Sequence, residues 1–210
     1  MASSFINQIP IIIHLIKKLQ PRSILDIGKV FGKYGFLVHE YVGIDNTKKI
    51  DPTKLLKEQS DLLMDAVEID LDLMLPHLGH LYNQVHFGDI LEIYEKLPKY
   101  DLILMIDIIE HINKKKAFLL LKYLLQQGAD IIIATPIEFF EQDLYQSDFE
   151  HHVSHWSRKD FKELGFLDMQ FFDAGAVYLL SNKKYDIRGF GISFVKKLRR
   201  IARCIKNEFY

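Results

Sequence analysis

The segment from Tyr100 to Ile106 is an almost continuous apolar run, and it restricts the possible folds of this chain more than any other feature. A strand without polar alternation is typical of a sheet that helices cover on both faces. Similar runs lie at Ser23–Gly28 and Asp130–Ala134, and residues 113–128 between them have helical spacing. Strands that alternate with helices favour a parallel sheet with right-handed crossovers, so the sequence predicts an α/β fold.

Weaker patterns add further elements to this core. The glycines after Ser23–Gly28 predict a helix at Phe36–Tyr41. The other expected elements are a helix at Ile11–Leu19, strands at Ala66–Ile69 and Gln84–Phe87, a broken helix at Leu71–Leu81, a short helix at Ser157–Leu164, and a hairpin of Leu167–Phe172 with Ala176–Ser181. We expect one domain over residues 1–190 and a basic amphipathic helix over residues 191–210.

Charge and cysteine content narrow the class of protein. Lys and Arg number 27 against 28 Asp and Glu, so no overall field favours a polyanion, and we expect no nucleic-acid partner. The lone cysteine, Cys204, excludes an intrachain disulfide and fits a reducing cytoplasm. The apolar run Ile9–Ile16 is broken by Pro10 and lacks a cleavage site, so we expect a cytoplasmic protein without a signal peptide.

A glycine loop follows the first predicted strand, in the order Asp26-Ile-Gly28-Lys-Val-Phe-Gly32. Glycine lets a backbone approach a ligand closely and adopt positive φ. The dinucleotide fingerprint is absent because Val30 stands where its second glycine would be, which disfavours a nicotinamide cofactor. The loop is thus either a ligand-binding turn of another kind or a plain tight turn.

Acidic residues stand where successive strands end, at the edge where open α/β sheets bind ligands. Glu68 ends the second strand, where its carboxylate could accept both hydroxyls of a ribose while Ile69 covers an adenine face. Asp89, followed by Ile90, could accept a hydrogen bond from the adenine amino group, and Asp107 ends the fourth strand. Singly, each acid could equally be a solvated side chain or a helix cap.

Several runs together resemble the class I S-adenosylmethionine-dependent methyltransferases, over residues 23–181. They are ILDIGKVFGKYGF, VEID, FGDI, YDLILMIDIIEH and EHHVSHW. Asp26, Gly28 and Gly32 match the family's D-x-G-x-G-x-G loop, and Val30 departs from its middle glycine. The resemblance implies a Rossmann-like fold with a central, mostly parallel sheet, an antiparallel C-terminal hairpin and helices on both faces.

The resemblance also implies an activity and a cofactor site. The activity would be methyl transfer from S-adenosylmethionine to a small-molecule acceptor. The family's pattern would place Gly28 and Gly32 against the methionine part, Glu68 on the ribose, Asp89 and Ile90 at the adenine, and Asp107 near the methionine amino group.

Histidines are the candidate catalytic residues. Methyl transfer needs a positioned nucleophile and exclusion of water, and a general base helps an oxygen or nitrogen acceptor. We name His111, His152 and His155 for this role. Alternatively, His111 begins a helix and bonds to backbone, and His152 holds its loop beside Trp156.

The group Glu150, His151, His152 and His155 contains suitable metal ligands. The residues between His152 and His155 fit a loop as well as a helix, and we predict no metal site there.

The basic C-terminal helix leaves alternatives open. From Phe194 onward its apolar residues share one helical face and lysines and arginines surround it. It could be a solvated face, a contact with an anionic membrane surface, or an oligomer contact. The alternative function, suggested by Val30 in place of the family's glycine, is a noncatalytic nucleoside or S-adenosylmethionine-binding module that interacts through this helix.

Overall fold

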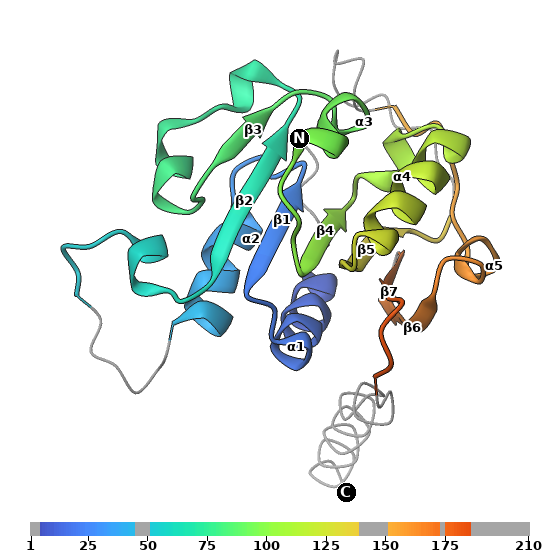
Figure 1. The fold of residues 1–210 in the computed structure, drawn as a ribbon, viewed down its shortest axis with the longest axis horizontal. Coiled ribbons are helices and arrows are strands. Elements are labelled where there is room, and N and C mark those ends of the chain that lie inside the picture. The colour runs from blue at the N-terminus through green and yellow to red at the C-terminus, as the bar shows by residue number, and fades with distance from the viewer. Residues whose placement is uncertain (1–4, 45–50, 139–150, 173–174, 186–210) are drawn as a thin grey trace, which may run out of the picture.

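One sheet of seven strands, in the order β3-β2-β1-β4-β5-β7-β6, organises the computed structural model (Figure 1). The structure describes residues 5–44, 51–138, 151–172 and 175–185. The strands are β1 (Ser23–Ile27), β2 (Leu63–Glu68), β3 (Val85–Phe87), β4 (Leu102–Ile106), β5 (Asp130–Pro136), β6 (Phe166–Phe172) and β7 (Gly175–Leu180). Strands β1 to β5 are parallel, and β7 pairs antiparallel with both β5 and β6. The predicted α/β class, the mostly parallel sheet and the C-terminal hairpin are confirmed.

Helices and single turns connect the strands. The α-helices are α1 (Ile9–Leu19), α2 (Lys33–Val38), α3 (Ile90–Ile93), α4 (Lys114–Gln126) and α5 (Arg158–Phe161). A π-helix, η2 (His39–Gly43), continues α2. The 3₁₀ turns are η1 (Ile6–Gln8), η3 (Leu56–Gln59), η4 (Leu71–Leu73), η5 (Pro76–His80), η6 (Tyr94–Lys96) and η7 (Ile109–His111).

Two hydrophobic cores lie on the two faces of the sheet. Within β4, Leu102 and Leu104 pack with α1 and α2, whereas Ile103 and Met105 pack with α4. Successive side chains of a strand point to opposite faces, so an apolar residue at every position serves both cores. This arrangement explains why β4 and β5 read as continuous apolar runs.

Several element boundaries differ from those predicted, and the helical segments in the first half of the chain show three of these differences. Helix α1 begins at Ile9 instead of Ile11, because Pro10 occupies its first turn, where no amide donor is needed. The helix after the glycine loop begins at Lys33 instead of Phe36. The broken helix predicted at Leu71–Leu81 is two separate 3₁₀ turns, η4 and η5.

The predicted C-terminal helix over residues 191–210 lies outside the described residues. Within the described part of the chain, no helix has the length and apolar character needed to cross a bilayer.

A buried polar contact ties η5 and the residues after it to β1. The hydroxyl of Tyr82 donates to Oδ2 of Asp26 at 2.6 Å and accepts from the backbone N–H of Gly35 at 3.2 Å. Tyr82 and Asp26 are 1% and 2% exposed, so water cannot replace either partner. The hydroxyl therefore links β1, which precedes the glycine loop, to α2, which follows it.

We expect Tyr82→Phe to lower the free energy of unfolding by about 1–3 kcal/mol, because it leaves buried groups without a partner. Denaturant unfolding monitored by circular dichroism measures the change. Tyr41→Phe is the matched control, since Tyr41 is exposed. Equal stability of the two variants would mean that the Tyr82 hydroxyl contributes nothing to the fold.

Candidate functional site

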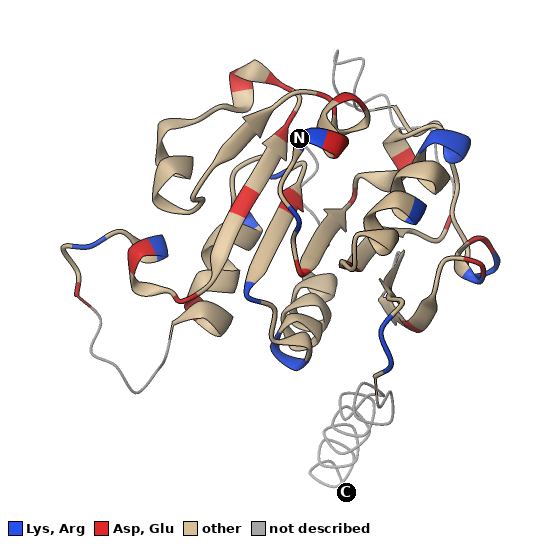
Figure 2. Cartoon of the chain, viewed as in Figure 1, with Lys and Arg blue, Asp and Glu red and all other residues tan. Residues whose placement is uncertain are grey.

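The predicted site residues gather where the parallel strands end at their carboxyl edge. The strand order reverses between β1 and β4, and such a switch point is the usual ligand crevice of an open α/β sheet. Acidic residues lie along this edge near the ends of β2 and β4 (Figure 2). The edge therefore combines a crevice position with negative charge.

The loop after β1 has an unusual backbone. Gly28, Val30 and Gly32 have φ angles of 72°, 46° and 76°, in the left-handed region. A Cβ at Gly28 would collide with the side chain of Ile108, which would have to move, and the positive φ itself favours glycine at this position. Val30 adopts the same region with a branched side chain, which stores strain.

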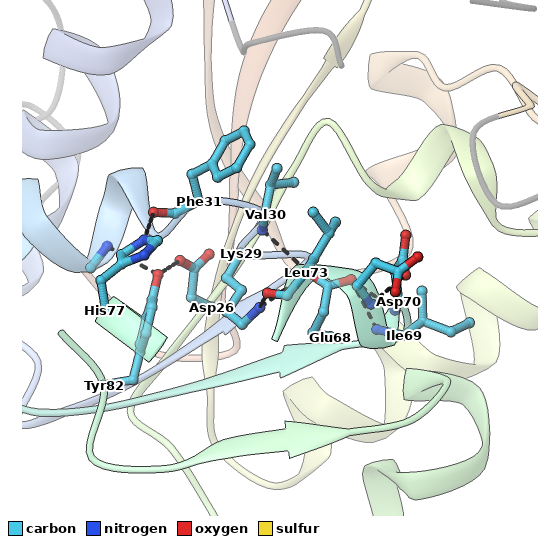
Figure 3. A network of polar contacts seen from close by, with 12 residues as sticks. Asp26, Lys29, Val30, Phe31, Glu68, Ile69, Asp70, Leu73, His77 and Tyr82 are labelled. Atoms are coloured by element: carbon cyan, nitrogen blue, oxygen red, sulfur yellow. Dashed lines mark hydrogen bonds and ion pairs between the residues drawn. The ribbon is translucent and has the colours of Figure 1, made fainter. Parts of the chain in front are cut away.

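Glu68 binds the loop after β1 and the turn after β2 (Figure 3). Its Oε1 accepts from the N–H groups of Ile69 at 3.0 Å and Asp70 at 3.1 Å. Its Oε2 accepts from Val30 N–H at 3.3 Å and lies 3.5 Å from Nζ of Lys29. A carboxylate offers about four acceptor positions, so a ribose could bind Glu68 only by displacing a donor. The contact with Lys29 is the longest of the four.

Lys29 lies beside Glu68 and was not among the site residues predicted from the sequence. Its side chain is fully buried, and Nζ also donates to the carbonyl of Leu73 at 2.9 Å. Burial lowers the pKa of Lys29, and the charge of Glu68 opposes the decrease. The sequence did contain a signal for this ion pair: Lys29 stands inside the glycine loop, and the next strand ends with the acidic residue Glu68.

Asp26 supports the loop from within the sheet. Burial raises its pKa to about 7, while the hydrogen bond from Tyr82 and the charge of Lys29 act in the opposite direction. Its carboxylate contacts Tyr82, so the structure gives Asp26 a supporting position below the loop.

Asp89 and Ile90 follow β3 as predicted. Asp89 caps α3, with Oδ1 accepting from Leu91 N–H at 2.9 Å. The helix-cap alternative is thus confirmed, and contact with an adenine stays a prediction. The Ile90 side chain is buried in the core, whereas Ile69 is half-buried beside Glu68. Contact of Ile90 with an adenine stays a prediction.

Asp107 follows β4 with a positive φ of 55°. Its Oδ2 accepts from Nε2 of Gln8 at 2.9 Å, and its charge acts on nearby Lys33, whose pKa is lowered chiefly by burial. Gln8 is fully buried. Gln8 could not be assigned to the site from the sequence, because it lies in a turn far from the strand ends along the chain.

The fold brings His111 and His152 together. Their ring centroids lie 4.9 Å apart in an edge-on arrangement, and Nδ1 of His111 is 3.1 Å from the carbonyl oxygen of His151. His155 is directed elsewhere, with Nε2 2.5 Å from the carbonyl oxygen of Ile137. Of the three predicted catalytic histidines, His111 and His152 therefore form one pair and His155 is a neighbour.

Backbone contacts hold the histidine segment in place. The N–H groups of Val153 and Ser154 donate to the carbonyl of Glu110 at 2.8 and 3.0 Å. The indole of buried Trp156 donates to Ser154 Oγ at 2.8 Å, and Ser154 Oγ donates to Ile109. Residues 153–156 are thereby fixed to η7.

Glu110 directly precedes His111 and was not among the site residues predicted from the sequence. It is 3% exposed, and among the described residues no hydrogen-bond partner reaches its Oε2. Burial and then the charge of Asp107 raise its pKa to about 8, against a hydrogen bond from Thr135. A small pocket adjoins this carboxyl group, and its lining residues are Glu110, Thr135, Pro136, Glu138, His152, Ser154 and His155.

The sequence matches no protein-family model and no curated protein. The structure matches the methyltransferase domain of bacterial CtHen1 with a TM-score of 0.53 and 14% identity, covering 84% of this chain and 100% of that domain. It matches a putative caffeoyl-CoA O-methyltransferase from Staphylococcus aureus with a TM-score of 0.53 and 18% identity, covering 86% of each chain. It matches a SAM-dependent methyltransferase from Archaeoglobus fulgidus with a TM-score of 0.53 and 20% identity, covering 78% of this chain and 69% of that one. The chain therefore has the Rossmann-like methyltransferase fold.

We expect Val30→Gly to raise the free energy of unfolding by about 1 kcal/mol, because glycine removes the left-handed strain of a branched residue. Denaturant unfolding at neutral pH measures the change. Val153→Gly provides the comparison, since Val153 is exposed and has no positive φ. A loss of stability as large as in Val153→Gly would contradict strain at Val30.

Proposed function

We propose that this chain is an S-adenosylmethionine-dependent methyltransferase that acts on a small-molecule acceptor. The observation that carries the proposal is the contact between the left-handed loop after β1 and the carboxylate that ends β2. In a methyltransferase fold these two features flank the crevice at the strand switch point. The similar structure from Archaeoglobus fulgidus, described as a SAM-dependent methyltransferase, supports the same cofactor at the level of the fold.

The residues present fit such a cofactor. Gly28 and Gly32 would face its methionine part, Asp107 would bind its amino group, and Asp89 would lie near its adenine. Glu68 would bind the ribose hydroxyls after exchanging its longest contact, the one with Lys29. When bound, S-adenosylmethionine supplies an electrophilic methyl group.

The protein's own contribution would be to orient the acceptor and to remove its proton. His152 lines the pocket beside Glu110. The ring of His111 lies against that of His152, and burial lowers the pKa of His111. A neutral imidazole near pH 7 can accept a proton from a hydroxyl or amine. We therefore place the acceptor at this pocket.

Isothermal titration of the full chain with S-adenosylmethionine and S-adenosylhomocysteine tests the proposal. We expect saturable binding of both, and no binding of NAD as the control. Binding followed by no methyl transfer across a broad acceptor panel would favour the noncatalytic module. Failure to bind either compound would contradict the methyltransferase function and favour the noncatalytic module.

We expect Glu68→Gln to weaken binding of S-adenosylmethionine by about 1–3 kcal/mol, because the ribose loses a charged acceptor. The same titration measures the dissociation constant. Glu95→Gln serves as the control, because Glu95 is exposed on η6. An unchanged dissociation constant in Glu68→Gln would exclude Glu68 from the cofactor site.

A further inference from the structure

Three side chains with metal-binding atoms converge beside the pocket next to Glu110. They differ from the group of possible ligands considered in the sequence, which runs from Glu150 to His155. Glu110, His111 and His152 each offer one ligand atom, and these atoms all lie within 4.8 Å of one another. Glu110 and His111 belong to η7 after β4, whereas His152 belongs to the described residues 151–157, which precede α5. Of the earlier group, Glu150 lies outside the described residues and His155 bonds to Ile137.

A second observation points to a ligand at this place. Oε2 of Glu110 is buried, and no donor among the described residues reaches it. A buried polar atom without a partner costs free energy, and such atoms are rare in native proteins. A bound cation would give this oxygen the partner that the described part of the chain does not supply.

The environment of His111 suits a metal ligand. Its Nδ1 lies 3.1 Å from the carbonyl oxygen of His151, and a carbonyl can only accept, so Nδ1 carries the proton. Nε2 then keeps its lone pair. Metal-binding histidines commonly donate their other ring nitrogen to a carbonyl in this way, which fixes the tautomer and the ring.

The two segments that supply these residues are joined by backbone hydrogen bonds. Val153 and Ser154, which directly follow His152, both donate to the carbonyl of Glu110, at 2.8 and 3.0 Å. Ligand positions fixed by backbone contacts need little reorganisation to bind.

We propose that Glu110, His111 and His152 bind a divalent transition-metal ion. Two imidazoles and a carboxylate suit zinc and its neighbours among the first-row metals. Bonds of about 2.0–2.2 Å require ligand atoms roughly 3.4 Å apart in a tetrahedral site, so the side chains would move together modestly on binding. Three protein ligands leave an open coordination position on the side of the pocket lined by Thr135, Pro136 and Glu138.

The open position also indicates an acceptor class. An acceptor that binds there would carry an oxygen atom able to coordinate the ion, such as a hydroxyl group, and coordination would make its proton easier to remove. With the ion bound, His111 and His152 would use their lone pairs as ligands, so the ion would take over the part of the imidazole base and the proton would pass to solvent. This assignment rests on the proposed function, whereas the metal site does not.

The test uses the full chain without a histidine tag, after treatment with a chelator. We expect one equivalent of Co²⁺ to bind with visible absorption bands and Zn²⁺ to displace it. Glu110→Gln and His152→Ala should each weaken Co²⁺ binding at least tenfold. His14→Ala should leave it unchanged, because His14 is exposed on α1.

Undiminished affinity in His152→Ala, or weak binding that His14→Ala reduces equally, would overturn the proposal and indicate surface histidines. Circular dichroism without metal checks that each variant folds. If Glu110→Gln does not fold, the half-buried His152 decides the result through His152→Ala. Titration with S-adenosylmethionine on the same samples separates the two proposals: a protein that binds Co²⁺ but no cofactor keeps the metal site and loses the methyltransferase function.

Discussion

The pairing of β1 between β2 and β4 is the constraint on which the rest of the site depends. Ile27 is in register with Val67 of β2 and Met105 of β4. The residues that follow these positions therefore emerge at nearly the same level of the sheet. This register alone places the glycine loop, Glu68 and Asp107 around one crevice, although they lie far apart in the sequence.

Most of the fold could be predicted because its determinants are local. The apolar runs of β4 and β5 indicate strands buried on both faces, and the acids that follow β2, β3 and β4 mark the carboxyl edge. Helix boundaries were less predictable. Pro10 looked like an interruption of an apolar run, whereas it stabilises the first turn of α1.

The site could be predicted only in part, because its polar contacts join distant segments. The sequence placed Glu68 at the end of a strand, but it could not show that Lys29, Val30, Ile69 and Asp70 direct their donors at its carboxylate. In the same way, proximity in sequence grouped His152 with His155. Folding instead puts His152 against His111, because the backbone of Val153 and Ser154 bonds to η7.

The contact between Gln8 and Asp107 has a consequence for the order in which the chain can fold. The two residues are separated by 99 positions, and Gln8 is fully buried where they meet. During synthesis from the N-terminus, Gln8 leaves the ribosome long before β4 is complete, so η1 has no carboxylate to dock against. The contact that buries Gln8 can therefore form only after the centre of the sheet has been translated.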